Sequence, residues 1–553
     1  MKKNWLRQII VGILLLGMMS VSTLAAQDIK QYEITRANLK LAEMKYEHIE
    51  YTEIENLLKQ IDEIIDKEDK EAFYNWDEAY YGLYCKVNTM IQIAQLNYQL
   101  HTNQSQYFDE YLYSVDLLGK MKTAYIRAFE EKEDTLSNDM MKFYELSIER
   151  SKLVDEYLAK ELNVTITANN KKMTLVDILK DSSLTDSEMS TLYDEWYTAY
   201  NKATGEIMLK LIKIDNQIAG LQGYDTYAEA AYKSYSRDYT PEQIKDFIVA
   251  VKEVIPSTFL KIYKSNLAAT SILSSYSYES DTSLLQSMDK GFISHHKELK
   301  EAYDYMRKYE LYDIETREYK ENGGFTTYFD QLAEPYIVIN YVEPYETALT
   351  FIHEFGHYFS YYKIGNNEGG LDLDETYSQT LELLAMPYYS EIFENDQFSK
   401  AAKIYTVENM LGAILQGCLY DEFLQEVYKN PNITVDEMNE LYSKIAQEYG
   451  LRVDGRSWCN VPHNFQTPFY YISYSVSAVA ALEVWTKSLE LEEVGINTYL
   501  KLIEAGKEKS FIDSLKSVGL SNPFEKETLR KIVLGIETYF DIGEQASELK
   551  NAA

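Results

Sequence analysis

Two histidines four residues apart, with a glutamate directly after the first, constrain this chain more than any other feature. His353, Glu354 and His357 stand in the stretch TFIHEFGHYFSYY, residues 350–362. Residues i and i+4 of an α-helix lie one turn apart on the same face, so both imidazoles can point at one ion if the stretch is helical. Glu354 is offset by about 100° around the helix, where it can hold a water beside that ion. The stretch therefore predicts a helix that carries two metal ligands and a base.

Composition and context support this interpretation of the motif. The chain has seven histidines among 553 residues, so chance would place the pattern in roughly 1 of 100 chains of this composition. Pro344 can stand in the first turn of the helix. Gly356 inside the helix costs about 1 kcal/mol relative to alanine, so we expect another element to approach closely there. Apolar residues at steps of three or four predict that one face of the helix is buried: Leu349, Ile352, Phe355 and Phe359.

A third ligand is expected on a second helix, which the pattern predicts over residues 371–386. Glu375 and Glu382 lie two helical turns apart, so both can face the same point. Spacing alone does not choose between them, and Asp372 and Asp374 could accept the other N–H of the histidine rings. For any one of these carboxylates, the alternative is a solvated acidic face. Two imidazoles with an oxygen ligand suit zinc, whose catalytic sites leave a fourth position for water.

The stretch HEFGH, followed after a Gly-rich turn by DETYSQTLE, resembles the thimet-oligopeptidase and oligoendopeptidase F family of zinc metallopeptidases. The resemblance implies that Glu375 is the third ligand and joins His353 and His357 around one zinc ion per chain. It implies that Glu382 contacts the metal ligands and does not itself bind the metal. The fold that it implies is mainly α, with two helical lobes around a deep substrate channel and a small β-ribbon next to the HExxH helix.

Two short β-rich runs, FTTYF and PYIVINY, precede the motif within residues 323–347. Short runs of β-branched and aromatic residues predict strands, and two such strands could form a ribbon. An edge strand beside the metal helix could hold an extended peptide by main-chain pairing. A purely structural hairpin is the alternative. The resemblance favours the peptide-holding role, because similar family members carry a Gly-Gly turn and a strand ending in Asn-Tyr before HExxH.

A further stretch, WCNVPHNFQTPFYYISYSVSAVAAL over residues 458–482, carries the same resemblance. In the family segment, histidine and tyrosine donors reach the substrate carbonyl, which implies that role for His463 and Tyr474, with Tyr470 as a further candidate. Tyr470 and Tyr474 are one helical turn apart, so both can face one point. Phenol donors aimed at a developing oxyanion lower the reaction barrier. In a chain with 50 tyrosines, the alternative is that these are ordinary packing aromatics.

The N-terminal residues 1–26 have the pattern of a secretory signal peptide. Basic residues precede an apolar run, and small residues after it offer a cleavage site. The apolar run is too short for a comfortable membrane span. We therefore expect an exported, extracytoplasmic protein, which an uncleaved signal segment could tether to the membrane.

The remainder is predicted to form two parts. Residues 27–180 show helical periodicity and no catalytic constellation, which predicts an N-terminal helical lobe. Residues 181–553 are the expected catalytic helical domain with the zinc site. Within that domain, residues 218–243 resemble a family segment that ends in Arg-Asp-Tyr-Thr, for which the pattern indicates no role.

The formal net charge is −34 at pH 7, and the sequence contains no block of basic residues. An acidic surface without basic patches argues against nucleic acid as a partner. The expected partners are short peptide substrates, and no stable membrane insertion is expected after signal cleavage.

Together these patterns predict a secreted zinc metalloendopeptidase in which Glu354 activates a metal-bound water that attacks oligopeptides. One alternative is a catalytically silent secreted peptide-binding protein on the same scaffold. Another is a carboxypeptidase-like relative. Many relatives carry a histidine three residues beyond HExxH, where this chain has Ser360, and most relatives lack a signal peptide. The first departure bears on substrate preference and the second on the compartment in which the protein acts.

Overall fold

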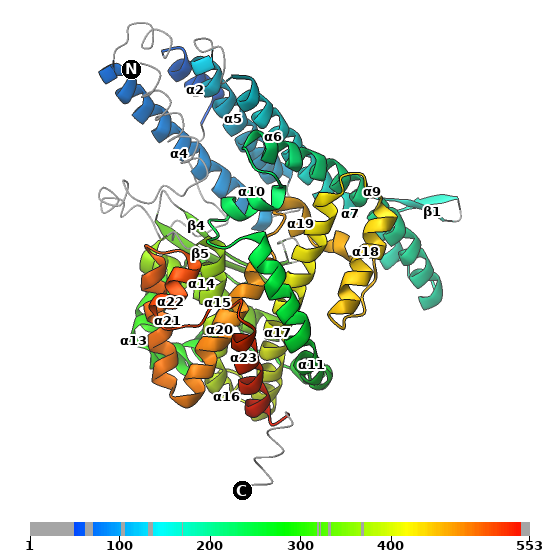
Figure 1. The fold of residues 1–553 in the computed structure, drawn as a ribbon, viewed down its shortest axis with the longest axis vertical. Helices are drawn as coiled ribbons and strands as arrows, with labels where there is room; N and C mark the ends of the chain where they lie inside the picture. Colours follow the sequence, from blue (N-terminus) through cyan, green and yellow to red (C-terminus); the bar gives the residue numbers. More distant parts are fainter. Residues whose placement is uncertain are drawn as a thin grey trace. The chain divides into compact units, whose positions relative to one another are not determined.

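The computed structural model describes residues 49–60, 70–100, 105–130, 137–168, 170–317, 320, 322–329, 333–365 and 370–542 (Figure 1). The predicted signal segment, residues 1–26, lies outside this part of the chain. The described residues are mainly α-helical, as predicted, with a few short strands. They divide into two compact units, each assembled from three stretches of sequence. None of the described helices is long and apolar enough to cross a membrane.

Unit 1 takes the described residues of Met1–Ser137, Lys261–Met410 and Ala480–Leu520. Its elements are α2 (Tyr51–Leu58), α4 (Lys70–Leu100), α5 (Ser105–Glu130), α12 (Asp281–Gly291), η4 (Ile293–His295), α13 (Lys297–Tyr309), β3 (Tyr312–Asp313), β4 (Gly323–Phe329), β5 (Glu334–Asn340), α14 (Pro344–Ile364), α15 (Gly370–Ala385), η5 (Met386–Tyr388), α16 (Tyr389–Ile392), α21 (Glu492–Gly506) and α22 (Phe511–Ser517). Three helices continue from one unit into the other: α11 (Pro241–Leu273), α17 (Asp396–Lys429) and α20 (Ile472–Glu490).

Unit 2 takes the described residues of Asn138–Leu260, Leu411–Val479 and Ser521–Ala553. Its elements are α6 (Ser137–Leu158), α7 (Lys160–Asn163), β1 (Ile166–Ala168), β2 (Lys171–Met173), α8 (Leu175–Lys180), α9 (Asp186–Leu221), α10 (Tyr227–Ser234), α18 (Val435–Glu448), η6 (Ser457–Asn460), α19 (His463–Gln466) and α23 (Lys526–Phe540). The predicted boundary between residues 180 and 181, and the predicted channel, stay predictions.

The small sheet of unit 1 has the strand order β3-β5-β4. Strands β4 and β5 pair antiparallel with Thr326 opposite Ile337, which confirms the predicted ribbon. The sheet also has a third strand that the sequence did not predict, because β3 is two residues long and pairs parallel to β5. Every residue of β5 is buried, so β5 is the central strand and β4 lies at the edge. The ammonium group of Lys320 links strands β3 and β5, because it donates to the carboxylate of Asp313 and to the carbonyl of Ile339.

Helix α14 forms the centre of unit 1, between the sheet and helix α15 (Figure 1). Pro344 occupies its first turn, as predicted, and Gly365 ends it with a φ of 67°, which a glycine adopts without strain. The predicted apolar stripe is buried, since Leu349, Ile352 and Phe355 are less than a tenth exposed. Because the apolar face of α14 is buried along the helix, the helix has a fixed position. The side chains on its opposite face are therefore held in place.

Candidate metal centre

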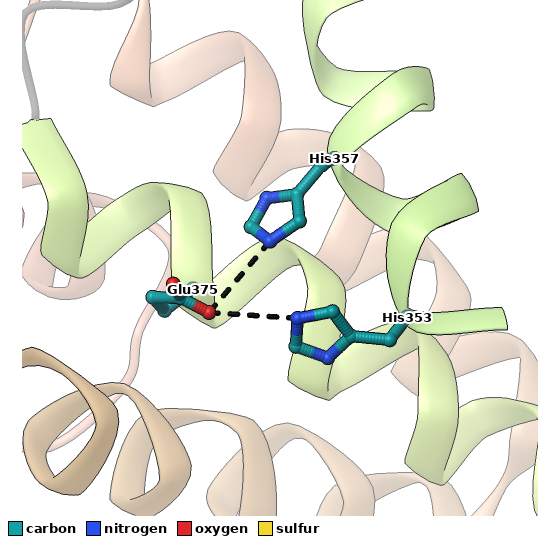
Figure 2. Close-up of side chains that lie close together, drawn as sticks. All are labelled: His353, His357 and Glu375. Carbon is teal, nitrogen blue, oxygen red and sulfur yellow. Dashed lines mark ion pairs between the residues drawn. The ribbon is translucent and has the colours of Figure 1, made fainter. Parts of the chain in front are cut away.

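Helices α14 and α15 bring His353, His357 and Glu375 to one point (Figure 2). The Oε2 atom of Glu375 lies 3.6 Å from Nε2 of His353 and 3.7 Å from Nε2 of His357. Two ligand atoms bound tetrahedrally to one zinc at roughly 2.0 to 2.2 Å lie about 3.4 Å apart. The observed distances therefore fit a zinc ion between the three side chains. All three donor atoms lie within 4.8 Å of one another, and they form the one such group in the described residues.

Gly356 allows the two ligand helices to lie this close together. A Cβ atom at Gly356 would stand 2.6 Å from the Cα of Ser378 and 3.1 Å from the carbonyl oxygen of Tyr377. No side chain fits in that space, because the atoms that it would meet are backbone atoms of α15. The structure thus confirms the predicted close approach at Gly356. Glu375 lies three residues before Ser378, so this contact sets the distance between the carboxylate and the two imidazoles.

Glu382 supports the first ligand from the side opposite the metal position. The Nδ1 atom of His353 lies 2.6 Å from Oε1 of Glu382, which places the proton on Nδ1 and leaves Nε2 free to bind a metal. Burial lowers the pKa of His353, but the hydrogen bond and charge of Glu382, with smaller contributions from other carboxylates, raise it to about 10. Burial and the charge of His353 hold the pKa of His357 well below its usual range. Glu382 therefore makes His353 the more basic of the two imidazoles.

The sequence had also left Asp372 and Asp374 open as supporting acceptors. Asp374 forms a side-chain hydrogen bond with Tyr361, and burial, together with the charges of nearby carboxylates, raises the pKa of that phenol. Asp372 is buried, and its carbonyl accepts a hydrogen bond from Thr376. For His353 the acceptor is Glu382, two helical turns beyond Glu375, as the resemblance implied.

The carboxylate of Glu354 is held by strand β4. The hydroxyl of Thr326 donates to Oε2 of Glu354 at 2.7 Å, and Glu354 is 4% exposed. Burial raises the pKa of this carboxyl. The strand can come so near because Gly324 has no side chain, since a Cβ there would lie 2.4 Å from Cγ2 of Thr350 and 3.2 Å from Oε1 of Glu354. The sequence did not reveal the role of Thr326, although its position in the FTTYF strand, next to a Gly-Gly pair, was the available signal.

Ser360, which replaces a histidine of many relatives, is fully buried. Its hydroxyl donates to the carbonyl oxygen of His357 at 2.9 Å, within its own helix. The side chain is therefore engaged with the helix backbone and is not available as a donor to a ligand.

The three predicted donors of the second motif lie together in unit 2. The ring of His463, on α19, lies 5.0 Å from the ring of Tyr470 and 6.4 Å from that of Tyr474. The rings of Tyr470 and Tyr474 are 5.4 Å apart. Tyr471, which the sequence did not single out, also contacts His463 at 5.1 Å. Burial lowers the pKa of His463, so the imidazole is neutral at neutral pH. The metal ligands belong to unit 1 and these donors to unit 2.

Comparison with known sequences finds similar proteins over the region that contains these features. A sequence model of peptidase family M3 matches residues 294–534. Oligopeptidase PepF of Bacillus subtilis (strain 168) is 23% identical over 363 residues, which are 59% of this chain and 52% of that protein. The oligoendopeptidase F homolog of Borreliella burgdorferi is 25% identical over 218 residues, which are 36% of this chain and 37% of that protein. The matched region thus spans about half of these relatives, or less.

Solved structures share the fold over almost the whole chain. Pz peptidase A with an inhibitor has a TM-score of 0.71 at 21% identity, and the match covers 92% of this chain and 100% of that one. Oligoendopeptidase F from Enterococcus faecium has a TM-score of 0.59 at 15% identity, with 91% and 98% covered. These identities show the fold alone. The sequence match to peptidase family M3 includes both ligand helices and the sheet beside them, and the fold of the chain is similar to that of these peptidases.

Proposed function

We propose that this chain is a secreted zinc-dependent metalloendopeptidase that hydrolyses short peptides. The observation that carries the proposal is the meeting of His353, His357 and Glu375 at distances that suit one ion. Beside them, Glu354 is buried and oriented by Thr326. Similarity to oligopeptidase PepF and to an oligoendopeptidase F homolog supports the same class of reaction.

His353, His357 and Glu375 would hold the zinc, and Glu382 would keep His353 in the tautomer that binds metal. Zinc in such a site supplies Lewis acidity, which makes water acidic near neutral pH and polarises a carbonyl group. Two imidazoles and one carboxylate form one of the donor sets that catalytic zinc sites use.

Glu354 is the general base of the proposed reaction. Its carboxylate takes a proton from the attacking water as the water oxygen bonds to the carbonyl carbon of the scissile peptide. When the C–N bond breaks, the same carboxyl group delivers that proton to the leaving amine nitrogen. The products are a peptide with a new carboxylate and a peptide with a new amine. Thr326 keeps the carboxylate in one orientation through this exchange.

His463 and Tyr474, with Tyr470, are the proposed donors to the oxyanion that develops on the substrate carbonyl. Their rings contact one another, so the three side chains form one group of donors. Donors that are already oriented lower the barrier because they need not reorganise as charge develops. This role comes from the family resemblance, and the arrangement within unit 2 supports it.

Strand β4 is the proposed place for the substrate backbone. It pairs with β5 on one side only among the described strands. An extended peptide could add to the other edge by main-chain hydrogen bonds, which bind peptides with little regard to their side chains. The carbonyl of Tyr328 is already engaged there, because it accepts a hydrogen bond from Gln92. We therefore assign the part of β4 before Tyr328 to the peptide.

The proposed extracytoplasmic location is supported by the sequence pattern of residues 1–26. Expression of the full chain in a bacterial host, followed by fractionation and N-terminal sequencing of the product, tests it. A product in the exported fraction that begins near residue 27 supports secretion. A full-length product that stays in the cytoplasmic fraction would overturn it.

Hydrolysis of a pool of short quenched peptides by the purified chain tests the activity, with zinc quantified on the same sample. We expect about one zinc per chain and cleavage that Glu354→Gln abolishes without loss of zinc. Bound zinc without cleavage of any peptide would favour the silent peptide-binding protein. Release of single C-terminal residues only would favour a carboxypeptidase-like enzyme, and absence of zinc would overturn the ligand assignment.

A further inference from the structure

The turn between helices α19 and α20 has a strained backbone. Phe469 has a φ of 67°, in the left-handed region that a bulky residue rarely adopts. The residue is 1% exposed, and its ring packs against Tyr227, Tyr232 and Tyr428. Tyr470 follows it directly, so this conformation sets the direction in which the chain enters the helix that carries Tyr474. Strain of this kind persists only where neighbouring groups hold it.

The guanidinium of Arg237 is the group that holds this turn. Its Nη2 atom donates to the carbonyl of Phe469 at 2.8 Å, to the hydroxyl of Ser473 at 2.8 Å and, at 3.4 Å, to the carbonyl of Tyr470. Arg237 is 6% exposed, so water does not compete for these hydrogen bonds. One planar group thereby joins the strained turn to the first turn of α20.

Arg237 is itself fixed in place by aromatic rings and a buried carboxylate. Its guanidinium lies 4.5 Å from the ring centre of Tyr232 and 4.9 Å from that of Tyr235. The hydroxyl of Tyr232 donates to Asp421 at 2.7 Å, and the charge of that carboxylate interacts with the charge of Arg237. A planar cation packed on aromatic rings has little freedom to rotate. The donors of Arg237 are therefore oriented before any substrate arrives.

A second arginine fixes the other end of the same segment. Arg150 donates to the carbonyls of Phe465 and Gln466, each at 3.1 Å, at the end of helix α19. Its Nε atom is bound to the buried Asp215 at 2.7 Å. Tyr235 also holds the segment, since its hydroxyl donates to the carbonyl of Pro468 at 3.1 Å. The backbone from Phe465 to Tyr470 is thus held by side chains from outside it.

We propose that Arg237 is a positioning residue for the donor group His463, Tyr470 and Tyr474. This inference rests on the proposed function. Arg237 acts through the backbone: it keeps Phe469 in its strained conformation, and that conformation keeps the two tyrosines in contact with His463. Without the guanidinium, the turn relaxes and the donors move relative to one another. A displacement of about 1 Å in a catalytic group lowers the rate by roughly 100-fold.

The test compares kcat and KM for one quenched peptide in the native chain, Arg237→Gln, Arg237→Lys and a control, Arg456→Gln. Arg456 is a matched control because it also stacks on a tyrosine, Tyr197, and bonds to carboxylates in unit 2, but belongs to a different network. We expect kcat to fall about 10- to 100-fold in R237Q, with KM and zinc content unchanged. R456Q should keep the native kcat. A donor that acts only in the transition state lowers kcat and kcat/KM together.

Two further measurements separate positioning from a general loss of structure. The first is the double variant with Tyr474→Phe. If Arg237 acts through Tyr474, R237Q should lower kcat by less than threefold in the Y474F background. The second is rescue of Arg237→Ala by millimolar guanidinium chloride, which should restore part of kcat because the ion can occupy the place of the side chain. If R237Q does not fold, R237K takes its place, since a lysine keeps the charge but lacks the planar fork.

The outcomes separate this inference from the proposed function. A native chain that cleaves no peptide would overturn the proposed function. If the native chain cleaves peptides and R237Q and R237K retain its kcat, the proposed function stands and the role of Arg237 is wrong. The role is also wrong if the fold-loss of kcat in the double variant equals the product of the fold-losses in R237Q and Y474F. The two residues would then act independently.

Discussion

The Nδ1 atom of His353 lies 2.6 Å from Oε1 of Glu382, two helical turns from the carboxylate that meets the same ring at Nε2. One imidazole therefore bridges two glutamates of α15, which act on opposite nitrogens. Glu375 shares the proposed metal position, whereas Glu382 fixes the proton and the orientation of the ring. In the sequence, the seven-residue spacing made the two glutamates equivalent candidates. In the structure, the same spacing places them at opposite nitrogens of one ring, which gives them different roles.

Replacement of Glu382 by glutamine should weaken zinc binding. The amide has no negative charge, so it raises the basicity of His353 less, and loss of such a supporting acceptor typically lowers metal affinity 10- to 100-fold. The measurement is competition for zinc against a chelator of known affinity. Glu346→Gln in α14, the helix that carries both histidines, serves as the control, because Glu346 lies in the first turn of that helix. Equal zinc affinity in E382Q and the native chain would contradict the supporting role.

Gly356→Ala should separate the ligand helices. The new Cβ would stand 2.6 Å from a backbone atom of α15, and overpacking of this kind costs about 1 to 3 kcal/mol of unfolding free energy. Because the atoms that the Cβ would meet belong to the backbone, we expect a cost in the upper part of this range, above the gain of about 1 kcal/mol in helix propensity. We expect lower stability in urea and weaker zinc binding. Gly119→Ala in α5 is the matched control, because its Cβ would have no atom within 4 Å and the substitution should not destabilise the chain.

Thr326→Val should lower kcat with little change in zinc content. The substitution keeps the shape of the side chain and removes its hydrogen bond to Glu354. A hydrogen bond to a charged group contributes about 1.5 to 3 kcal/mol, so a loss of roughly 10-fold or more in kcat is expected. Thr327→Val on the same strand is the control, since neighbouring strand residues point to opposite faces. Native activity in T326V would show that Glu354 needs no partner on β4.

The ligand helix could be predicted from the sequence because its signals are local. Pro344, the apolar stripe and the i, i+4 histidines all act within one helix, and Gly356 correctly indicated a close neighbour. The spacing of Glu375 and Glu382 placed both on one face, but their separate roles needed the position of α15 relative to His353. The family resemblance supplied that distinction.

Contacts between distant parts of the chain explain what the sequence did not reveal. Strand β3 has two residues, too few for a periodic pattern, and it exists through its pairing with β5. Thr326 and Glu354 meet only because of the packing of β4 on α14. Arg237 lies 232 residues before the carbonyl that it holds. The Arg-Asp-Tyr-Thr motif that contains Arg237 was recognisable in the sequence, but the contact of Arg237 with the carbonyl of Phe469 was not.

Asp421 should make the stability of the native chain depend on pH. Burial raises its pKa to about 6, although hydrogen bonds from Tyr232 and Gln425 oppose the shift. The usual value is 3.8, so between these values the folded state binds more protons than the unfolded state. The contribution of the group to stability is therefore fully present below about pH 4 and is lost as the pH rises through 6.

The measurement is the urea unfolding free energy of the native chain and of Asp421→Asn at pH 5 and pH 7. Asparagine does not titrate, so subtracting the two proteins removes the pH dependence of every other group. We expect the native chain to lose about 1 kcal/mol relative to D421N over this interval, from the linkage of about 1.4 kcal/mol per pKa unit. A difference that stays constant, or that grows in favour of the native chain as the pH rises, would mean that Asp421 is ionised in the folded state throughout. In that case the charge of Arg237, rather than burial, would determine its protonation.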